Sequence, residues 1–357
     1  MRVRFFDPSR VYAAQQAELS AAVHEVLASR QVVLGPQVEA FERELAAAVG
    51  VAFAVGVASG TDALELALRA LDISADAEVL CPDLTSPATA TAILRAGLRP
   101  LLVDVDEETL TIDPSAAASA VDQRTAAIVA VHLYGRAAAL QALSELGLPL
   151  VEDAAQAHGL ELDRGSAGGV GMVGCFSFYP TKNLGAFGDA GAVTTPDAEL
   201  AARVRRLRQY GQRERDYAEE LGANSRLDEL QAAILRVRFP RLAQENLRRA
   251  EIAASYDDAL GRASPRGVHH LYVLRSPERE QARLFLQKSG IDTGVHYPSP
   301  ISAQPAFSDA RVAGSVEVAS KAAKEVFSVP CHAHLSRAEE EHVASVLVRM
   351  AAALPVR

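Results

Sequence analysis

Three short segments of the chain carry residue types that could do chemistry together, and each follows a run of apolar residues. The first is Ser59-Gly60-Thr61-Asp62, which opens a helical pattern. Small residues let a backbone approach an anion closely, and the free amides and dipole of a helix N-terminus favour a phosphate there. The alternative is a plain helix N-cap by Ser59 or Thr61, with Asp62 in the first turn.

The second segment, residues 151–158, runs from an apolar strand pattern into two consecutive acids, Glu152 and Asp153, followed by Gln156. Successive strand residues point to opposite faces, so Glu152 and Asp153 cannot both face one pocket. One acid at the end of a strand is a natural partner for a protonated ring nitrogen. A solvated turn would account for these two acids equally well.

The third segment, residues 175–191, places Lys182 in a glycine-containing loop after an aromatic strand pattern. A lysine amine becomes a nucleophile when desolvation or a neighbouring charge lowers its pKa, although most lysines are simply solvated. A phosphate cradle, an acid for a pyridinium nitrogen and a reactive lysine are together what pyridoxal phosphate requires. We therefore expect pyridoxal 5'-phosphate (PLP, alternating with its amine form PMP) to be bound to Lys182 as a Schiff base.

Alternation of short β-branched runs with alanine- and leucine-rich stretches predicts the elements that hold these segments. Such alternation is typical of an α/β fold with a mainly parallel mixed sheet flanked by helices, whose ligands sit beyond the carboxyl ends of the strands. The expected strands are 51–57, 78–81, 101–105, 126–133, 148–152, 176–179 and 191–194, with helices at 61–71, 88–96 and 137–146.

The remaining sequence predicts an N-terminal helical arm and a smaller C-terminal α+β domain. A helical region at 226–251, starting near Asn224 and interrupted by Pro240, separates a large domain (1–240) from a small one (241–357). A strand at 269–274 is expected to pair with 292–296. The other expected helices are 13–29, 38–49, 199–209, 279–289 and 339–353.

Composition narrows the possible functions. The formal net charge of -9 argues against a broad nucleic-acid-binding face. Three widely spaced cysteines show neither a disulfide framework nor a metal-binding spacing, which favours a reducing, cytoplasmic location and no metal site. The sequence contains neither a signal-peptide pattern nor an apolar run of membrane-spanning length, so no membrane association is expected.

The sequence resembles the sugar aminotransferases of the DegT/DnrJ/EryC1/StrS family, which share the aspartate aminotransferase (PLP fold type I) architecture. The likeness covers nearly the whole chain and is strongest in ASGTDALELALRAL, VEDAAQAHG, SFYPTKNLGAFGDAGAV and SRLDELQAAIL. The resemblance implies that Lys182 carries the cofactor and shuttles a proton, and that Asp153 keeps the pyridine nitrogen protonated.

The resemblance also implies the remaining contacts. The phosphate would be held by Ser59, Gly60, Thr61 and Ser177, and Gln156 would approach the phenolic oxygen. Asn224 would reach the phosphate site of a second subunit, so the active sites would be shared in a homodimer. The candidate substrate contacts are Tyr179, His296 and Tyr297.

Two residues depart from the family pattern. Ser86 stands where an aromatic ring usually stacks on the cofactor, so either another side chain covers that ring or the cofactor is held more weakly. Ser302 stands where the family often has a histidine, which affects a substrate contact rather than the transamination chemistry.

The loop after Lys182, with Asp189 near its end, looks like that of family members that aminate 3-keto sugars. We therefore expect transfer of an amino group, by family habit from glutamate, to C3 of a nucleotide-linked 3-keto-6-deoxyhexose. A C4 aminotransferase acting on a nucleotide-linked 4-keto sugar and a cyclitol (keto-inositol) aminotransferase are the alternatives.

Overall fold

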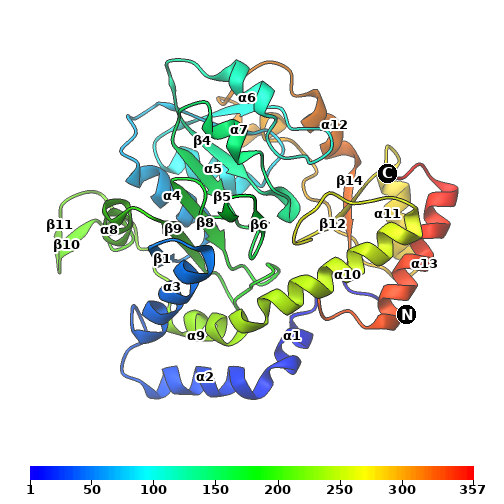
Figure 1. Cartoon of the computed structure of the whole chain (residues 1–357), viewed down its shortest axis with the longest axis horizontal. Helices are drawn as coiled ribbons and strands as arrows, with labels where there is room; N and C mark the ends of the chain where they lie inside the picture. Colours follow the sequence, from blue (N-terminus) through cyan, green and yellow to red (C-terminus); the bar gives the residue numbers. More distant parts are fainter.

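An eight-stranded sheet forms the centre of the computed structural model, which describes residues 1–357 (Figure 1). Its strands are β1 (Phe53–Val57), β2 (Glu78–Pro82), β3 (Arg99–Val103), β4 (Thr125–Val131), β5 (Leu150–Asp153), β8 (Val173–Ser177), β9 (Gly191–Thr195) and β13 (Arg311–Val312). Their order across the sheet is β1-β9-β8-β5-β4-β2-β3-β13. Only β9 runs against its neighbours, so the sheet is the mainly parallel mixed sheet that the sequence predicts.

Helices cover both faces of this sheet, because successive strand residues are buried on alternate sides. In β4, Val129 packs into one core cluster while Ile128 and Ala130 pack into another. The first face is covered by α4 (Gly60–Ala70), α5 (Pro87–Arg95), α8 (Ala198–Leu207) and α12 (Glu317–Glu325). The second face is covered by α3 (Pro36–Val49), α6 (Pro114–Ala120), α7 (Leu140–Ser144) and α9 (Glu229–Arg238). Residues of the inner strands β2, β4, β5 and β8 are therefore almost all buried.

A smaller C-terminal part lies beside the sheet and has its own core of 17 buried residues (Figure 1). It consists of α10 (Leu242–Leu260), β12 (Tyr272–Arg275), α11 (Arg279–Lys288), β14 (Val326–Val329) and α13 (Arg337–Ala353). Not all later residues belong to this part: β13 pairs with β3 in the large sheet, and α12 packs on that sheet. The division near residue 240 stays a prediction.

The first residues of the chain belong structurally to the C-terminal part. The Val3 N–H donates to the Gly290 carbonyl at 2.8 Å, and the Asp292 N–H donates to the Val3 carbonyl at 3.0 Å. From there, α1 (Pro8–Ala14) and α2 (Gln16–Ala28) lead back along α9 to the large sheet (Figure 1). The N-terminal arm therefore spans both parts of the molecule.

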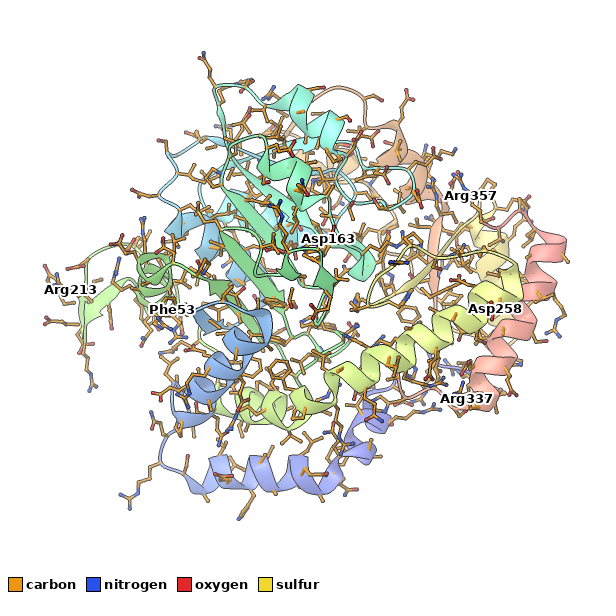
Figure 2. All side chains as sticks on the ribbon, in the orientation of Figure 1. Phe53, Asp163, Arg213, Asp258, Arg337 and Arg357 are labelled. Carbon is orange, nitrogen blue, oxygen red and sulfur yellow. The ribbon has the colours of Figure 1, made fainter.

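Several short elements complete the fold. A hairpin of β10 and β11 projects beside α8, and Arg213 lies on it (Figures 1 and 2). The short elements are β6 (Glu161–Leu162), β7 (Gly165–Ser166), β10 (Gln212–Glu214), β11 (Tyr217–Ala218), η1 (Leu133–Gly135), η2 (Phe239–Arg241), η3 (Ile301–Ala303) and η4 (Pro305–Phe307). No helix combines the length and the apolar character that crossing a bilayer requires.

The strand expected at 176–179 lies at Val173–Ser177, and four other predicted elements differ more strongly from the structure. The expected helix 13–29 is broken at Gln15, where the backbone leaves helical geometry and the side chain donates to the Val237 carbonyl at 3.1 Å. The helix expected near Asn224 begins at Glu229, because Asp228 provides the N-cap. The partner of β12 is β14, whereas 292–296 contributes a single bridge at Gly294. The expected helix 137–146 shrinks to α7.

Candidate active site

Asp153 is the last residue of β5 and points to the sheet face covered by α4 and α5. The Thr89 hydroxyl on α5 donates to its Oδ2 at 3.0 Å, and the Ala155 N–H donates to its Oδ1 at 3.2 Å. Burial raises the pKa of Asp153, while these hydrogen bonds and the charge of Lys182 act in the opposite direction. A buried carboxylate held only by neutral donors is suited to a cationic partner such as a protonated ring nitrogen.

Glu152 points the other way, as the strand alternation predicts. Its carboxylate binds His132 Nε2 at 2.9 Å and accepts from the N–H groups of Gly168, Val170 and Gly171 at 2.6–2.8 Å. Burial favours the neutral acid, but these hydrogen bonds outweigh it, so the pKa of Glu152 lies below its ordinary value. Glu152 is therefore a fully bound structural acid, and Asp153 is the one left for chemistry.

Lys182 follows the aromatic strand β8 and lies on the wall of a cavity of about 340 Å³. Burial lowers its pKa to about 8, and the negative charge of Asp153 limits the decrease. Near pH 8, roughly half of the Lys182 amine is therefore uncharged, whereas an ordinary lysine is almost fully protonated. The side chain is thus available as a nucleophile under ordinary conditions.

The residue after Lys182 anchors this loop to the C-terminal part. Asn183 Nδ2 donates to the Val268 carbonyl at 2.9 Å and to Asn246 Oδ1 at 2.8 Å. A carbonyl can only accept, so the Asn183 amide orientation is fixed and its Oδ1 faces His270 Nδ1 at 3.1 Å. Nδ1 of His270 must then carry the proton. The loop that positions Lys182 is consequently bound to both α10 and the segment before β12.

The N-terminus of α4 forms a cradle opposite β8. Ser59 caps the helix by accepting from the Asp62 N–H at 3.1 Å, so the N-cap reading of the sequence is correct. A Cβ at Gly60 would come within 2.5 Å of the Ser177 Cβ, so only glycine allows this approach. The N–H groups of Gly60 and Thr61 begin the helix and have no intrahelical acceptor, which leaves them for an anion next to Ser177.

Gln156 and Tyr297 meet next to Ser86. Gln156 Oε1 accepts from the Tyr134 N–H at 2.6 Å, which turns its Nε2 toward the Tyr297 hydroxyl at 3.2 Å. Burial raises the pKa of Tyr297, and a hydrogen bond with Ser86 opposes that shift. Tyr297 is thus the aromatic ring beside the residue that departs from the family pattern.

The cavity collects five of the residues that the sequence singles out: Gln156, Tyr179, Lys182, His296 and Tyr297. Asp153 and the cradle of Ser59, Gly60, Thr61 and Ser177 lie on the sheet side. Asn224 is exposed and does not contact the cavity, but its neighbour Ser225 donates to Asp62 Oδ2 at 2.8 Å. Its expected contact with a second subunit stays a prediction.

These residues fit pyridoxal phosphate. The cradle offers free N–H groups and small side chains to a phosphate, Asp153 is a buried acid bound only by neutral donors, and Lys182 is a buried amine with a lowered pKa. Gln156 presents a single free donor, as a phenolic oxygen requires.

Several residues of the site were missed by sequence reasoning. Thr89, Arg249 and His270 come from elements far from the three motifs, and Phe5 and Phe6 come from the N-terminal segment. Only Arg249 has a sequence signal, since it shares the buried face of α10 with Ile252, Ala253 and Tyr256. A charged residue on an apolar helix face is rarely accidental.

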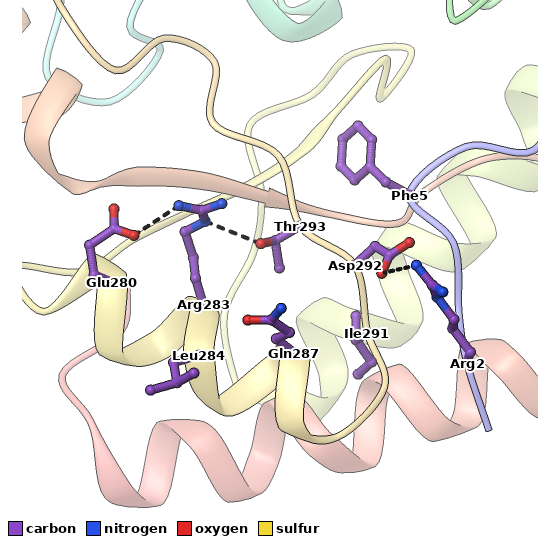
Figure 3. Close-up of a pocket in the computed structure, with 9 residues that line it drawn as sticks. All are labelled: Arg2, Phe5, Glu280, Arg283, Leu284, Gln287, Ile291, Asp292 and Thr293. Atoms are coloured by element: carbon purple, nitrogen blue, oxygen red, sulfur yellow. Dashed lines mark hydrogen bonds and ion pairs between the residues drawn. The ribbon is translucent and has the colours of Figure 1, made fainter.

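A second cavity, of about 670 Å³, adjoins the first because both are lined by Phe5, whose ring stacks on His296. Its charged side chains bind one another (Figure 3). Arg283 contacts Glu280 at 2.8 Å and Thr293 at 3.2 Å, and Arg2 lies 3.5 Å from Asp292.

Comparison with known proteins gives consistent matches over the whole chain. A model of the DegT/DnrJ/EryC1/StrS aminotransferase family matches residues 13–348. The chain is 44% identical over 351 residues to dTDP-3-amino-3,4,6-trideoxy-alpha-D-glucose transaminase of Streptomyces venezuelae, which covers 94% of this chain and 93% of that protein. It is 39% identical over 360 residues to dTDP-3-amino-3,6-dideoxy-alpha-D-galactopyranose transaminase of Aneurinibacillus thermoaerophilus, covering 97% and 99%.

The fold of the chain is also found among solved structures. The crystal structure of S. venezuelae DesV in complex with ketimine intermediate superposes with a TM-score of 0.94 at 43% identity, covering 98% of each chain. The mainly parallel sheet, its flanking helices and the smaller C-terminal part are therefore those of a PLP fold type I protein.

Proposed function

The chain belongs to the DegT/DnrJ/EryC1/StrS aminotransferase family, and we propose that it transfers an amino group from glutamate to C3 of a nucleotide-linked 3-keto-6-deoxyhexose. Pyridoxal phosphate is the cofactor of this family. The position of the amino group rests on the two relatives above, which both carry a 3-amino sugar in their names.

The observation that carries this proposal is the arrangement of Lys182 and Asp153. Two motifs almost thirty residues apart place a buried amine of lowered pKa and a buried acid so that their charges interact. This is the arrangement that lets one side chain bind an aldehyde while the other holds a ring nitrogen in its protonated form.

Bound pyridoxal phosphate would supply an aldehyde that stores the amino group between substrates and a ring that accepts the electrons released with the substrate proton. Lys182 would hold it covalently through Nζ and, once released, would move a proton to and from the reacting carbon. Gly60, Thr61, Ser177 and Ser59 would position the phosphate, and Asp153 would keep the ring nitrogen protonated.

The cavity-facing residues would do the rest of the positioning. The free Nε2 donor of Gln156 would face the phenolic oxygen, since its Oε1 is already bound to Tyr134. Tyr297 would provide the aromatic surface that Ser86 lacks, because its hydroxyl is fixed by Gln156 and Ser86. Tyr179 and His296 line the same cavity and would contact the sugar.

We further propose that the active protein is a cytoplasmic homodimer in which Asn224 completes the phosphate site of the other subunit. Its exposure and its position next to Ser225, which is bound to the helix cradle, support a role at a subunit interface. Sedimentation of the holoenzyme would test the dimer, and mixing Asn224→Ala with Lys182→Ala subunits would test sharing. Shared sites predict that each mixed dimer regains at most one active site.

The decisive test of the proposed function is a substrate screen with the purified holoenzyme. Thymidine-linked 3-keto and 4-keto 6-deoxyhexoses and a keto-inositol would be offered with glutamate, and amino products would be identified by mass spectrometry and NMR. We expect amination of the 3-keto sugar. Turnover only of the 4-keto sugar or of the cyclitol would reassign the substrate while leaving the cofactor chemistry unchanged.

A further inference from the structure

Arg249 lies on the wall of the cavity that contains Lys182, and its charge has no anionic partner within the chain. The residue is 4% exposed on the inner face of α10. Its Nη1 donates to the Cys331 carbonyl at 2.6 Å, while its Nε is buried without any partner. The carboxylate one turn earlier, Glu245, is already paired with Arg238 at 3.4 Å. The Nε–Nη2 edge of the guanidinium is therefore left unused.

Three arginines around Arg249 and the adjoining cavity are paired with acids. Arg248, the preceding residue on α10, lies 2.5 Å from Glu340 and 3.2 Å from Glu251. In the adjoining cavity, Arg283 and Arg2 each bind an acid (Figure 3). Because a buried and unpaired cation is costly, the exception at Arg249 calls for an anion that arrives from outside the chain.

The chemistry of the cavity favours an anion as well. None of its lining residues is Asp or Glu. Its histidines are uncharged at neutral pH, since burial lowers the pKa of His296 to about 4 and that of His332 to about 3. Arg249 thus supplies a permanent positive charge to this cavity, while Lys182 would be committed to the cofactor.

We propose that Arg249 binds a carboxylate of the amino donor, which makes the donor an amino acid and assigns its recognition to α10. The proposal rests on the proposed function, because only a transaminase needs a donor in this cavity. One guanidinium edge with two parallel N–H groups matches one carboxylate with two oxygens and one negative charge. A nucleotide diphosphate carries at least twice that charge, which a single buried arginine does not neutralise.

Binding of glutarate, an unreactive dicarboxylate, to the holoenzyme tests this assignment without turnover. Arg249→Gln removes the charge and keeps a donor for the Cys331 carbonyl, and Arg248→Gln is the matched control on the same helix. Calorimetry should show glutarate affinity about 10- to 100-fold weaker in Arg249→Gln, as expected for a lost charged hydrogen bond, and unchanged in Arg248→Gln. Equal weakening in both variants, or in neither, would overturn the proposal.

Measuring the two half-reactions separately distinguishes an effect on donor recognition from an effect on sugar recognition. Followed by cofactor absorbance, the reaction with glutamate should slow in Arg249→Gln by about the same 10- to 100-fold factor, while the reaction with the amino sugar should stay within about threefold. A larger loss in the sugar half-reaction would instead assign Arg249 to the diphosphate and reject the donor role.

If Arg249→Gln does not fold, the wild-type holoenzyme still decides the question. Glutaramide has the size of glutarate without its charges, and we expect it to bind at least about tenfold more weakly. Equal binding of the two compounds would refute the carboxylate site. Because these titrations contain no sugar, they can succeed even when the substrate screen fails, so failure of either proposal is recognised separately.

Discussion

The sheet side of the cavity and its C-terminal side are built from different kinds of side chain. On the sheet side, Asp153 and Lys182 are buried ionisable groups: burial raises the pKa of Asp153 and lowers the pKa of Lys182. On the C-terminal side, His296 and Tyr297 are neutral, and Arg249 carries the permanent charge. The difference indicates that charge on the sheet side would serve the cofactor, while the neutral His296 and the cation of Arg249 would distinguish the substrates.

Removing the reactive amine of Lys182 should abolish the function of the sheet side. In Lys182→Ala we expect transamination to fall by roughly 10³-fold or more, because both the covalent attachment and the proton carrier are lost. Borohydride reduction followed by peptide mapping should label position 182 in the wild type and nothing in the variant. Lys288→Ala, which removes an exposed lysine, is the control and should keep full activity. Labelling elsewhere in the wild type would refute the assignment.

The two neighbouring acids of β5 offer a sharper comparison. Asp153→Asn should lower the transamination rate by about 10²- to 10³-fold with little loss of stability, since the charge opposite the ring nitrogen disappears while Thr89 keeps a partner. Steady-state kinetics and thermal unfolding, measured side by side, would check both parts.

Glu152→Gln should show the reverse pattern. Losing a buried carboxylate that binds His132 and three backbone N–H groups should lower the free energy of unfolding by about 2–4 kcal/mol, while the activity of the folded fraction persists. The folded-state pKa of Glu152 is depressed, so its contribution is present above the ordinary value of 4.5 and is lost as pH falls below it. Identical behaviour of the two variants would contradict the different functions of these acids.

Tyr297→Leu tests what compensates for Ser86. Loss of an aromatic surface should weaken cofactor retention about tenfold, measured as the equilibrium constant for PLP release during dialysis. Tyr297→Phe keeps the ring and is the matched control. Adding Ser86→Tyr to Tyr297→Leu should restore retention; a double variant as weak as the single one would mean that Tyr297 does not cover the cofactor.

The smallest expected effect concerns pH. Since burial lowers the pKa of His296 to about 4, the affinity for the sugar nucleotide should change less than about twofold between pH 6 and 8. Stability behaves differently: the unfolded histidine, with a pKa near 6.5, binds more protons than the folded one, so stability falls as pH falls from about 6.5 to 4. Urea unfolding at several pH values would measure this decline, which His296→Gln should reduce.

Much of the sheet side could be predicted from the sequence because its information is local. Asp153 ends β5, Ser59 and Lys182 lie in the segments that follow β1 and β8, and the carboxyl ends of parallel strands meet at one edge. The opposite orientations of Glu152 and Asp153 follow from the period of a strand alone.

The C-terminal side could not be predicted because its geometry comes from packing between distant segments. Arg249 and His270 reach the cavity only through α10 and the chain before β12. The pairing of β12 with β14 joins segments far apart in the sequence, whereas residues 292–296 offered a partner nearer to β12 along the chain. The helix predicted to start near Asn224 begins only at Glu229, because the Asp228 side chain caps its first turn.

The hydrogen bonds between Val3 and the Gly290–Asp292 turn have a consequence for synthesis. Val3 leaves the ribosome long before Gly290 and Asp292, so Phe5 and Phe6 stay without their native neighbours during most of translation. Closing so long a loop makes this one of the slow contacts to form. A nascent chain should therefore be able to pair the seven sheet strands from β1 to β9 well before it can enclose a substrate.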